Sequence, residues 1–358
     1  MQTMKTEIIR IDPVRPEPEK LLYCGAVIRY GGIVAFPTET VYGLGANAFC
    51  AAAADKVFEA KGRPADNPLI VHVCDYDMAE KAADFASERQ MRQFYALGNE
   101  FWPGPMTMIV KKRSCIPDNI TCGLGTAGIR MPSNRIAAGL IRAAGVPVAA
   151  PSANSSGRPS PTRFSHVLED MSGKIDVIID GGDCSVGVES TVIDLSRDIP
   201  MILRPGAVTK EYIARVAGGC DEYDWLREKV KVDRPLSPGM KYRHYAPKAA
   251  MTVYSGEPEK VREKIISKIS SEKSSGKRVG VLATEEQICY YKDADLLVSL
   301  GPENEPAEHA KRLFDALRKF DEDGADVIFA HSLGFRGVDG AVMNRMFRAA
   351  GGRIEHIQ

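Results

Sequence analysis

From residue 251 onward, short apolar segments alternate with amphipathic segments, and this alternation restricts the fold more than any other feature of the chain. Strands that alternate with helices usually pair in parallel, with the helices packed on the faces of the sheet. The pattern predicts strands at 251–255, 278–283, 295–300 and 327–331, and helices at 257–273, 305–320 and 338–349. We therefore expect a small doubly wound parallel α/β domain at 251–358. It lacks the Gly-x-Gly-x-x-Gly turn that dinucleotide binding needs.

The first 217 residues show a less regular pattern, in which short apolar runs end in polar turns rich in Gly and Pro. Apolar runs predict short strands, and amphipathic segments closed by Gly predict helices. The expected strands lie at 33–36, 69–73, 106–112, 146–150, 175–180, 189–195 and 200–204, and the expected helices at 16–31, 50–60, 76–98 and 133–144. Residues 218–250 have little periodicity, so we interpret them as a linker. This linker is dense in aromatic and cationic side chains, which indicates a segment that docks on a binding surface, with the active site as one candidate.

The charges of the chain exclude some functions. Lys+Arg and Asp+Glu both number 47 in 358 residues, so the net charge is zero. A protein that coats nucleic acid or an anionic membrane would show a basic excess. We therefore expect no membrane partner and no strong direct binding of nucleic acid. A small basic pocket for a phosphorylated ligand remains compatible with this balance.

Cysteine spacing and hydropathy also restrict the interpretation. The eight cysteines are scattered without a Cys-x-x-Cys pair, and the six His are dispersed, so we expect no zinc or other protein-held metal site. No apolar run approaches the ~18 residues that a membrane-spanning helix needs, and the N-terminus has no apolar core of signal-peptide length. We expect a cytoplasmic protein.

The stretch KGRPADNPLIVH, residues 61–72, places two cations beside a buried strand. Lys61 and Arg63 are two residues apart, so in an extended segment their side chains point the same way. Gly62 between them allows close approach of the backbone to a ligand, and Pro64 ends any preceding helix. This arrangement is typical of a site that holds a polyanion, although a solvated turn would have the same sequence.

Similar polar turns recur along the N-terminal region. Arg130 is a lone cation in an apolar segment bounded by Gly and Pro, where an anionic partner is usual. Ser160 and Thr162 precede a predicted helix, which we expect them to cap. Each of the other turns follows or precedes a short strand, and together they contribute Thr38, Thr40, Thr126, Ser152, Asn154, Ser190 and Arg204.

These side chains indicate a class of chemistry. The chain has no Gly-x-x-x-x-Gly-Lys-Ser/Thr loop, no His-Glu-x-x-His and no Gly-x-Ser-x-Gly elbow. What remains is a set of cations, hydroxyl groups and amides that can position phosphates and a small polar molecule without a covalent nucleophile. Phosphoryl or nucleotidyl transfer needs little more, because its catalysis consists mostly of alignment and charge stabilisation.

The ordered motifs carry a specific resemblance. PTETVYGLGA, KGRPADNPL, PGPMT, GIRMP, APSANSSGRPSPT, GVESTVID and LRPG occur in the order found in YrdC-type threonylcarbamoyl-AMP synthases. The linker SPGMKYRHYAP, followed by a small α/β domain, is similar to the longer two-domain branch of that family. The resemblance implies a YrdC-like α+β catalytic domain with a twisted mixed sheet at 1–217, a linker that forms a lid at 218–250, and a Rossmann-like domain at 251–358.

The resemblance also implies an activity. Family members are nucleotidyltransferases that condense L-threonine, bicarbonate or CO2, and ATP into threonylcarbamoyl-AMP and pyrophosphate, usually with Mg²⁺. This is the first step of threonylcarbamoyladenosine formation in tRNA. A downstream threonylcarbamoyl transferase complex that acts on tRNA would receive the product.

Site residues follow from the motifs that match. Lys61, Arg63, Ser152 and Asn154 match the polar tetrad of the family, which surrounds the nucleotide and its phosphates and carries the catalysis. The resemblance assigns ATP contacts to Arg63, Asn67, Thr126, Ser152, Ser160 and Arg204. It assigns threonine contacts to Thr40, His72, Arg130, Ala150 and Ser190, with Arg130 pairing the carboxylate. The lid would contribute Lys241, His244 and Tyr245.

Two other functions remain open at this point. YrdC-like domains also occur in larger carbamoyltransferases that use carbamoyl phosphate, but those carry extra domains with zinc-type Cys pairs, which this chain lacks. The concave basic surface of the fold could instead hold double-stranded RNA. Zero net charge and the lack of stacking aromatic residues near the basic positions make an RNA-binding module the weaker alternative.

Overall fold

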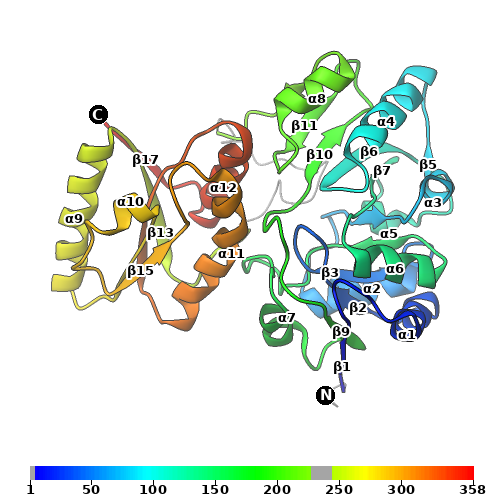
Figure 1. The fold of residues 1–358 in the computed structure, drawn as a ribbon, viewed down its shortest axis with the longest axis horizontal. Helices are drawn as coiled ribbons and strands as arrows, with labels where there is room; N and C mark the ends of the chain where they lie inside the picture. Colours follow the sequence, from blue (N-terminus) through cyan, green and yellow to red (C-terminus); the bar gives the residue numbers. More distant parts are fainter. Residues whose placement is uncertain (1–4, 227–243) are drawn as a thin grey trace. The chain divides into compact units, whose positions relative to one another are not determined.

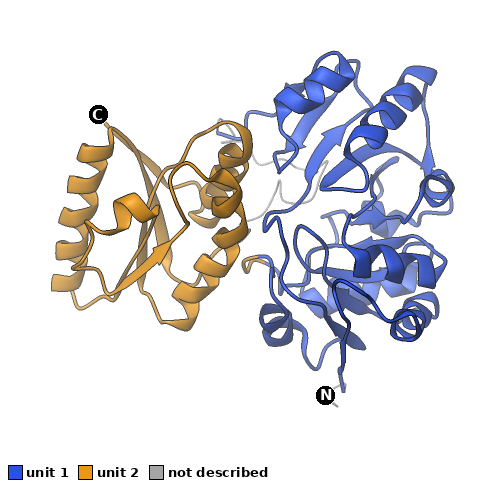
Figure 2. Ribbon diagram, viewed as in Figure 1, with its two compact units in different colours: residues 1–156, 160–242 blue, residues 157–159, 243–358 orange. Residues whose placement is uncertain are grey.

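The computed structural model describes residues 5–226 and 244–358, and the chain divides into two compact units (Figures 1 and 2). Unit 1 comprises Met1–Ser156 and Ser160–Tyr242, and unit 2 comprises Gly157–Pro159 and Arg243–Gln358. The division near residue 242 falls inside the segment predicted to be a linker. Within unit 2, the buried Arg318 donates a hydrogen bond to the carbonyl oxygen of Pro159 at 2.7 Å.

Unit 1 consists of short strands and helices. Its strands are β1 (Glu7–Arg10), β2 (Val34–Phe36), β3 (Gly43–Asn47), β4 (Ile70–His72), β5 (Ala83–Asp84), β6 (Met106–Lys112), β7 (Thr126–Arg130), β8 (Val148–Ala150), β9 (Val177–Asp180), β10 (Thr191–Asp194), β11 (Met201–Arg204) and β12 (Asp221–Glu222). Its helices are α1 (Pro18–Arg29), α2 (Ala51–Lys61), α3 (Tyr76–Ala82), α4 (Glu88–Phe101), α5 (Asp118–Thr121), α6 (Arg135–Ala144), α7 (Phe164–Met171) and α8 (Lys210–Ala217).

These strands form one mixed sheet. Its order is β1-β9-β2-β3-β8-β4-β7-β6-β10-β11-β12, with β5 paired to β6 at the side. The parallel pair β4 and β7 aligns His72 with Arg130, and the antiparallel pair β6 and β7 aligns Thr107 with Arg130. These polar residues of three neighbouring strands therefore lie side by side at the same end of the strands. The prediction of an α+β unit with a mixed sheet is confirmed.

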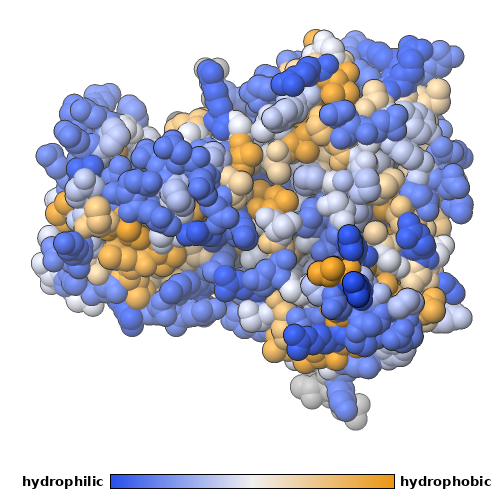
Figure 3. Space-filling model, viewed as in Figure 1, coloured by the Kyte–Doolittle hydropathy of each residue, from blue (hydrophilic) through white to orange (hydrophobic). Residues whose placement is uncertain are grey.

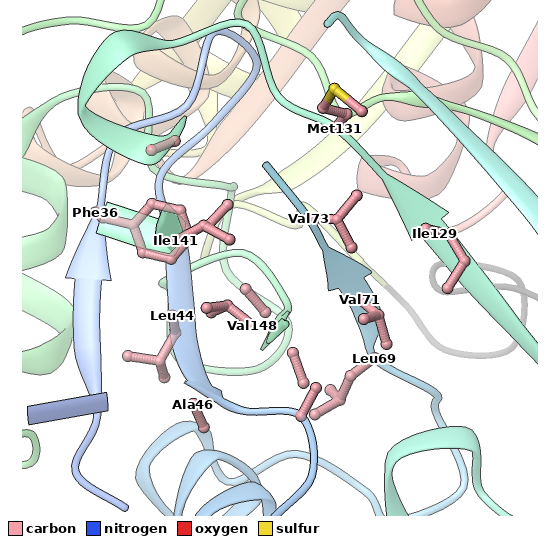
Figure 4. Close-up of a cluster of buried hydrophobic side chains, with 14 of the residues drawn as sticks. Phe36, Leu44, Ala46, Leu69, Val71, Val73, Ile129, Met131, Ile141 and Val148 are labelled. Atoms are coloured by element: carbon pink, nitrogen blue, oxygen red, sulfur yellow. The ribbon is translucent and has the colours of Figure 1, made fainter. Parts of the chain in front are cut away.

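The core of unit 1 is apolar and packs between the sheet and its helices. Val71 and Ile129 on neighbouring strands, Leu44 and Val148 on another pair, and Ile141 of α6 are all fully buried (Figure 4). α1 packs against α6. Burying one such aliphatic side chain stabilises the fold by roughly 1.5–3 kcal/mol. This core therefore provides a rigid base for the polar turns at the ends of the strands.

Local signals explain where several helices begin and end. The Asn134 side chain accepts hydrogen bonds from the backbone N–H groups of Ile136 and Ala137, which caps α6. Gly62 ends α2 with a left-handed φ of 59°. Lys61 is therefore the last residue of a helix, and the prediction that it lies in an extended segment is wrong.

Unit 2 is a parallel α/β domain, as predicted. Its strands are β13 (Ala250–Gly256), β14 (Val279–Ala283), β15 (Leu296–Ser299), β16 (Val327–His331) and β17 (Ile354–Ile357), and its helices are α9 (Pro258–Ser274), α10 (Glu285–Ile288), α11 (Pro306–Glu322) and α12 (Gly337–Ala349). The sheet order is β15-β14-β16-β13-β17, and every pairing is parallel. In Figure 1, α9 lies on one side of this sheet, and α11 and α12 lie on the other. The sequence pattern did not predict the short α10 or the terminal β17.

Hydrophilic side chains cover most of the face drawn in Figure 3. Within residues 5–226 and 244–358, no helix combines the length and the apolar character that crossing a membrane requires.

Candidate active site

The Lys61 side chain closes the turn that follows β8. Its Nζ donates hydrogen bonds to the carbonyl oxygens of Ser152, at 2.5 Å, and of Asn154. The Ser152 hydroxyl in turn donates to Asn154 Oδ1 at 2.5 Å. Lys61 is 3% exposed, so its charge is held among oxygen atoms away from water. Three members of the predicted tetrad therefore form one hydrogen-bonded group.

Arg63, the fourth member, holds the loop that leads into β4. Its Nε donates to the carbonyl oxygen of Asn67 and its Nη2 to that of Pro68, both at 3.0 Å. Asn67 is buried, and its Oδ1 has no hydrogen-bond partner among the described residues. A buried amide oxygen without a partner is costly unless a ligand or water supplies a donor. This loop is therefore suited to binding a ligand.

Arg130 has the anionic partner that its apolar surroundings in the sequence indicate, but the sequence did not identify that partner as Glu39. Its Nη2 lies 2.6 Å from Glu39 Oε1, and the two side chains are 4% and 7% exposed. The backbone N–H of Ser133 donates to Glu39 Oε2 at 3.2 Å. Arg130 Nε is buried and has no hydrogen-bond partner among the described residues. One donor of a buried guanidinium group therefore remains for an anionic or carbonyl acceptor.

His72 lies beside Arg130 in the sheet and is neutral. Its Nδ1 lies 3.2 Å from the carbonyl oxygen of Ile70. Burial, together with the positive charge of Arg130, lowers the pKa of His72 to about 3. A neutral ring next to the guanidinium group avoids repulsion between two buried cations. It also gives a bound ligand an uncharged neighbour.

A third group of polar side chains surrounds the start of β10. Ser190 Oγ lies 2.8 Å from Thr107 Oγ1 and accepts a hydrogen bond from Arg204 Nη2 at 3.1 Å. The hydroxyl of Ser160 donates to Glu189 Oε1 at 2.5 Å. Ser160 is fully buried, and the residue at the N-cap of α7 is Arg163. The prediction that Ser160 caps this helix is therefore wrong, because its hydroxyl is bonded to the carboxylate.

Residues 38–44 connect these groups. The backbone N–H of Tyr42 donates to Pro161, and its carbonyl oxygen accepts from Ala153, each at 2.8 Å. The carbonyl oxygen of Thr40 accepts from the N–H of Gly187 at 3.1 Å. Thr40 is fully buried, and its hydroxyl lies 2.9 Å from that of Thr38. One segment thus links the turns that carry the tetrad, Ser160 and Ser190.

The remaining predicted residues of unit 1 lie further along the same strands. Ala150, at the end of β8, pairs with Ile70 and is buried, so it offers a small apolar surface. Thr126 begins β7, at the opposite end of the strand from Arg130. Thr126 and Thr107 line one small cavity of about 20 Å³ with Pro68, whose carbonyl oxygen Arg63 binds. None of the four tetrad residues lines this small cavity.

The predicted lid residues are only partly described. Lys241 lies outside the described residues. His244 and Tyr245 belong to unit 2, where the Tyr245 ring packs 5.1 Å from that of Phe314. Tyr245 has a positive φ of 63°, which is uncommon for a residue other than Gly. The closure of this segment over the site stays a prediction.

Sequence reasoning missed three residues that organise the site. Glu39, Glu189 and Thr107 are all buried and bind predicted site residues directly. A signal was present for two of them, because an acidic residue between two hydroxyl residues, or beside an apolar strand, is rarely buried without a partner. No cluster of three or more His, Cys, Asp or Glu able to hold a metal ion occurs in the described part of the chain.

Comparison with known proteins agrees with this fold. A family model described as "Telomere recombination" matches residues 26–206, and one described as "Threonylcarbamoyl-AMP synthase, C-terminal domain" matches residues 208–351. The crystal structure of Pyrococcus abyssi Sua5 complexed with L-threonine superposes with a TM-score of 0.92. It is 46% identical and covers 99% of this chain and 100% of that one. The fold is therefore that of a two-domain enzyme with a mixed-sheet unit and a parallel α/β unit.

Two curated relatives that share one name match this chain over nearly their full length. The Bacillus subtilis protein named threonylcarbamoyl-AMP synthase is 44% identical over 99% of both chains. The Pyrococcus abyssi protein of that name is 47% identical over 95% of this chain and 96% of its own. The chain belongs to the threonylcarbamoyl-AMP synthase family, which confirms the resemblance and favours the synthase over the carbamoyltransferase and RNA-binding alternatives.

Proposed function

We propose that this enzyme condenses L-threonine, bicarbonate or CO2, and ATP into threonylcarbamoyl-AMP and pyrophosphate. The amine of threonine attacks the carbon of bicarbonate or CO2, which forms a carbamate with loss of water or a proton. A carbamate oxygen then attacks the α-phosphorus of ATP, and the bond to the β-phosphate oxygen breaks to release pyrophosphate. No covalent bond to the protein forms, so the protein contributes binding, alignment and charge stabilisation.

The unpartnered Nε of Arg130 is the observation that carries this proposal. It is a buried cationic donor beside the neutral His72, and Glu39 already neutralises the group. A charge-assisted hydrogen bond contributes roughly 1.5–3 kcal/mol. The carboxylate of threonine provides the acceptor that this donor lacks. The buried methyl group of Ala150 would then lie against the aliphatic part of the amino acid.

We assign the phosphates of ATP to the turns around Lys61 and Arg63. Lys61 donates hydrogen bonds to the backbone of Ser152 and Asn154, which orders this turn. The same contacts place its positive charge at the turn, where it would attract a phosphate. The phosphates would carry the negative charge that develops as pyrophosphate leaves. The buried Oδ1 of Asn67, which has no partner among the described residues, would accept a hydrogen bond from the nucleotide. Thr126, Ser160 and Arg204 complete the proposed nucleotide contacts.

Magnesium would accompany ATP as a substrate complex. Mg²⁺ usually binds through substrate phosphates with only one or two protein carboxylates. Glu189 is the buried acidic group next to the proposed ATP residue Ser160, to which it is hydrogen-bonded. Such a donor set fits an ion held mainly by phosphates, and we assign no permanently bound metal.

The remaining proposals concern the surroundings of the reaction. The adenylate product is a reactive mixed anhydride, so we propose that a downstream transferase complex consumes it to modify tRNA. We also propose a cytoplasmic location. The linker residues Lys241, His244 and Tyr245 would cover the site during the reaction, because a carbamate is labile in water.

Substitution of the two cations tests the site. Lys61→Ala and Arg63→Ala should abolish pyrophosphate release from ATP with threonine and bicarbonate, while circular dichroism remains that of the wild type. Lys56→Ala is the matched control, because Lys56 is an exposed cation on the same helix α2. Normal turnover by either folded variant would overturn the assignment of the phosphate site.

A further inference from the structure

Unit 2 contains a cavity that the proposed reaction does not use. Its volume is about 280 Å³, and it is lined from the carboxyl ends of β13, β14 and β16. In the strand order β15-β14-β16-β13-β17, β14 and β16 are neighbours. The chain leaves β14 towards β15 on one side of this pair, and it leaves β16 towards β17 on the other side. A crevice between adjacent strands whose connections leave in opposite directions is where open parallel sheets bind ligands.

The lining of this cavity is polar. Hydroxyl, amide and carboxylate groups come from Thr284, Gln287, Glu303, Asn304, Ser332 and Asp339. Among the described residues that line it, two are acidic and none is Lys or Arg. This charge disfavours a phosphate or carboxylate ligand. It favours a neutral or cationic molecule that carries hydroxyl or amino groups.

The hydroxyl of Thr284 is an independent indication that this cavity binds a ligand. It lines the cavity and is only 3% exposed, yet its Oγ1 has no hydrogen-bond partner among the described residues. Thr284 stands at the N-cap of α10, where a threonine hydroxyl normally accepts a bond from the helix, but its side chain makes no cap bond. A buried hydroxyl that is left unpaired costs free energy, which a ligand in the cavity would recover.

His331 lines the cavity at the end of β16. Its Nε2 is hydrogen-bonded to the hydroxyl of Tyr291, which fixes the orientation of the ring. Burial, with the nearby Arg262, holds the pKa of His331 at about 4, so the ring is neutral.

His309 fixes the orientation of the Asp339 carboxylate. The fully buried His309 lies with Nδ1 2.8 Å from Asp339 Oδ1 and with Nε2 2.8 Å from the carbonyl oxygen of Pro302. The contact with Pro302 fixes the orientation of the ring, and the ring in turn holds Asp339 Oδ1 in place. Asp339 lies in the first turn of α12 and lines the cavity at the carboxyl end of the parallel sheet, where a positioned carboxylate is a typical acceptor for the hydroxyl groups of a ribose.

We propose that this cavity binds a nucleoside without phosphates. Asp339 and Glu303 would accept hydrogen bonds from the ribose hydroxyl groups, and Thr284, Gln287 and Asn304 would pair with the remaining polar atoms. The two carboxylates reject nucleotides by charge repulsion, so the cavity discriminates against ATP and AMP, which the reaction in unit 1 handles.

Calorimetric titration of the full-length protein tests this proposal. The probes are adenosine, guanosine, cytidine and uridine, each compared with its 5′-monophosphate. At least one nucleoside should bind at one site, about tenfold or more tightly than its monophosphate. Thr284→Val should weaken that binding about tenfold. Thr252→Val, which removes a hydroxyl from β13 outside the cavity lining, should bind like the wild type.

A second variant fills the cavity. A Cβ at Gly334 would lie 3.5 Å from Asp339 Oδ2, an ordinary contact distance, so the backbone there accepts a side chain, and the leucine of Gly334→Leu should occupy the cavity and abolish nucleoside binding. Both variants should retain the pyrophosphate release of the wild type, which separates this site from the reaction in unit 1. The proposal is overturned if no nucleoside binds, if a monophosphate binds more tightly, or if binding survives both substitutions.

Discussion

At the scale of single residues, the site is built from buried charges that are neutralised in pairs or by backbone oxygens. Arg130 is paired with Glu39, and Lys61 is surrounded by the carbonyl oxygens of Ser152 and Asn154. Removing one partner of a buried ion pair usually costs 3–5 kcal/mol because the other charge stays buried. Each of these residues therefore affects stability as well as binding.

The role of Arg130 predicts a selective kinetic defect. Arg130→Lys keeps a positive charge but loses the planar donors, so we expect the KM for threonine to rise by about 10- to 100-fold, with a smaller change for ATP. Steady-state pyrophosphate release at varied threonine measures this effect. Arg135→Gln, an exposed position at the start of α6, is the control. An unchanged KM for threonine in Arg130→Lys would exclude the proposed carboxylate contact.

The pKa of His72 predicts a pH dependence of stability. The folded pKa of about 3 lies below the usual 6.5, so the unfolded chain binds a proton that the folded chain does not. This contribution is fully present above pH 6.5 and is lost as the pH falls towards 3. By pH 5 the loss amounts to about 2 kcal/mol. Between pH 7 and 5, urea unfolding should show that His72→Asn loses about 2 kcal/mol less than the wild type. Equal losses would contradict a neutral buried His72.

At the scale of elements, the end of α2 places Lys61 in the site. Gly62 adopts a left-handed conformation, and its N–H and that of Arg63 bond to the carbonyl oxygens of Glu59 and Phe58. This termination turns the chain sharply between the two cations. Lys61 and Arg63 therefore take different environments: Lys61 is buried against the turn after β8, and Arg63 binds the loop before β4.

Gly62→Ala tests this geometry. A side chain there meets no neighbouring atom, but the positive φ costs roughly 1 kcal/mol. Gly276→Ala, in the turn after α9, has a similar positive φ and equally open space, so it should lose about the same stability. Only Gly62→Ala should also lower kcat for pyrophosphate release. Equal kcat in the two variants would show that the turn at Gly62 does not position the catalytic cations.

The parts of the fold with strong local patterns were predictable from the sequence. The alternation after residue 251 gave the parallel sheet of unit 2, and the apolar run before His72 gave β4. The position of Lys61 in a helix was not predictable from its spacing to Arg63, because Gly62 allows both extended and left-handed backbone. The Arg130–Glu39 pair joins residues 91 positions apart, so only the tertiary fold reveals it.

At the scale of the whole molecule, two units with separate sheets occur in one chain. Unit 1 holds the predicted catalytic residues, and unit 2 holds its own polar cavity and the predicted lid residues His244 and Tyr245. Deletion of residues 237–358 would remove the lid motif, so we expect the shortened protein to stay folded but to lose most of its pyrophosphate release. Full activity of the shortened protein would make unit 2 an accessory domain.

Pyrophosphate release from ATP, with threonine and bicarbonate each present or omitted, tests the central claim most directly. The account predicts release only when both are present, because the carbamate that attacks ATP forms from the two together. Threonine should also be preferred to serine. Release without either substrate, or no release despite tight binding of ATP, would contradict the proposed reaction.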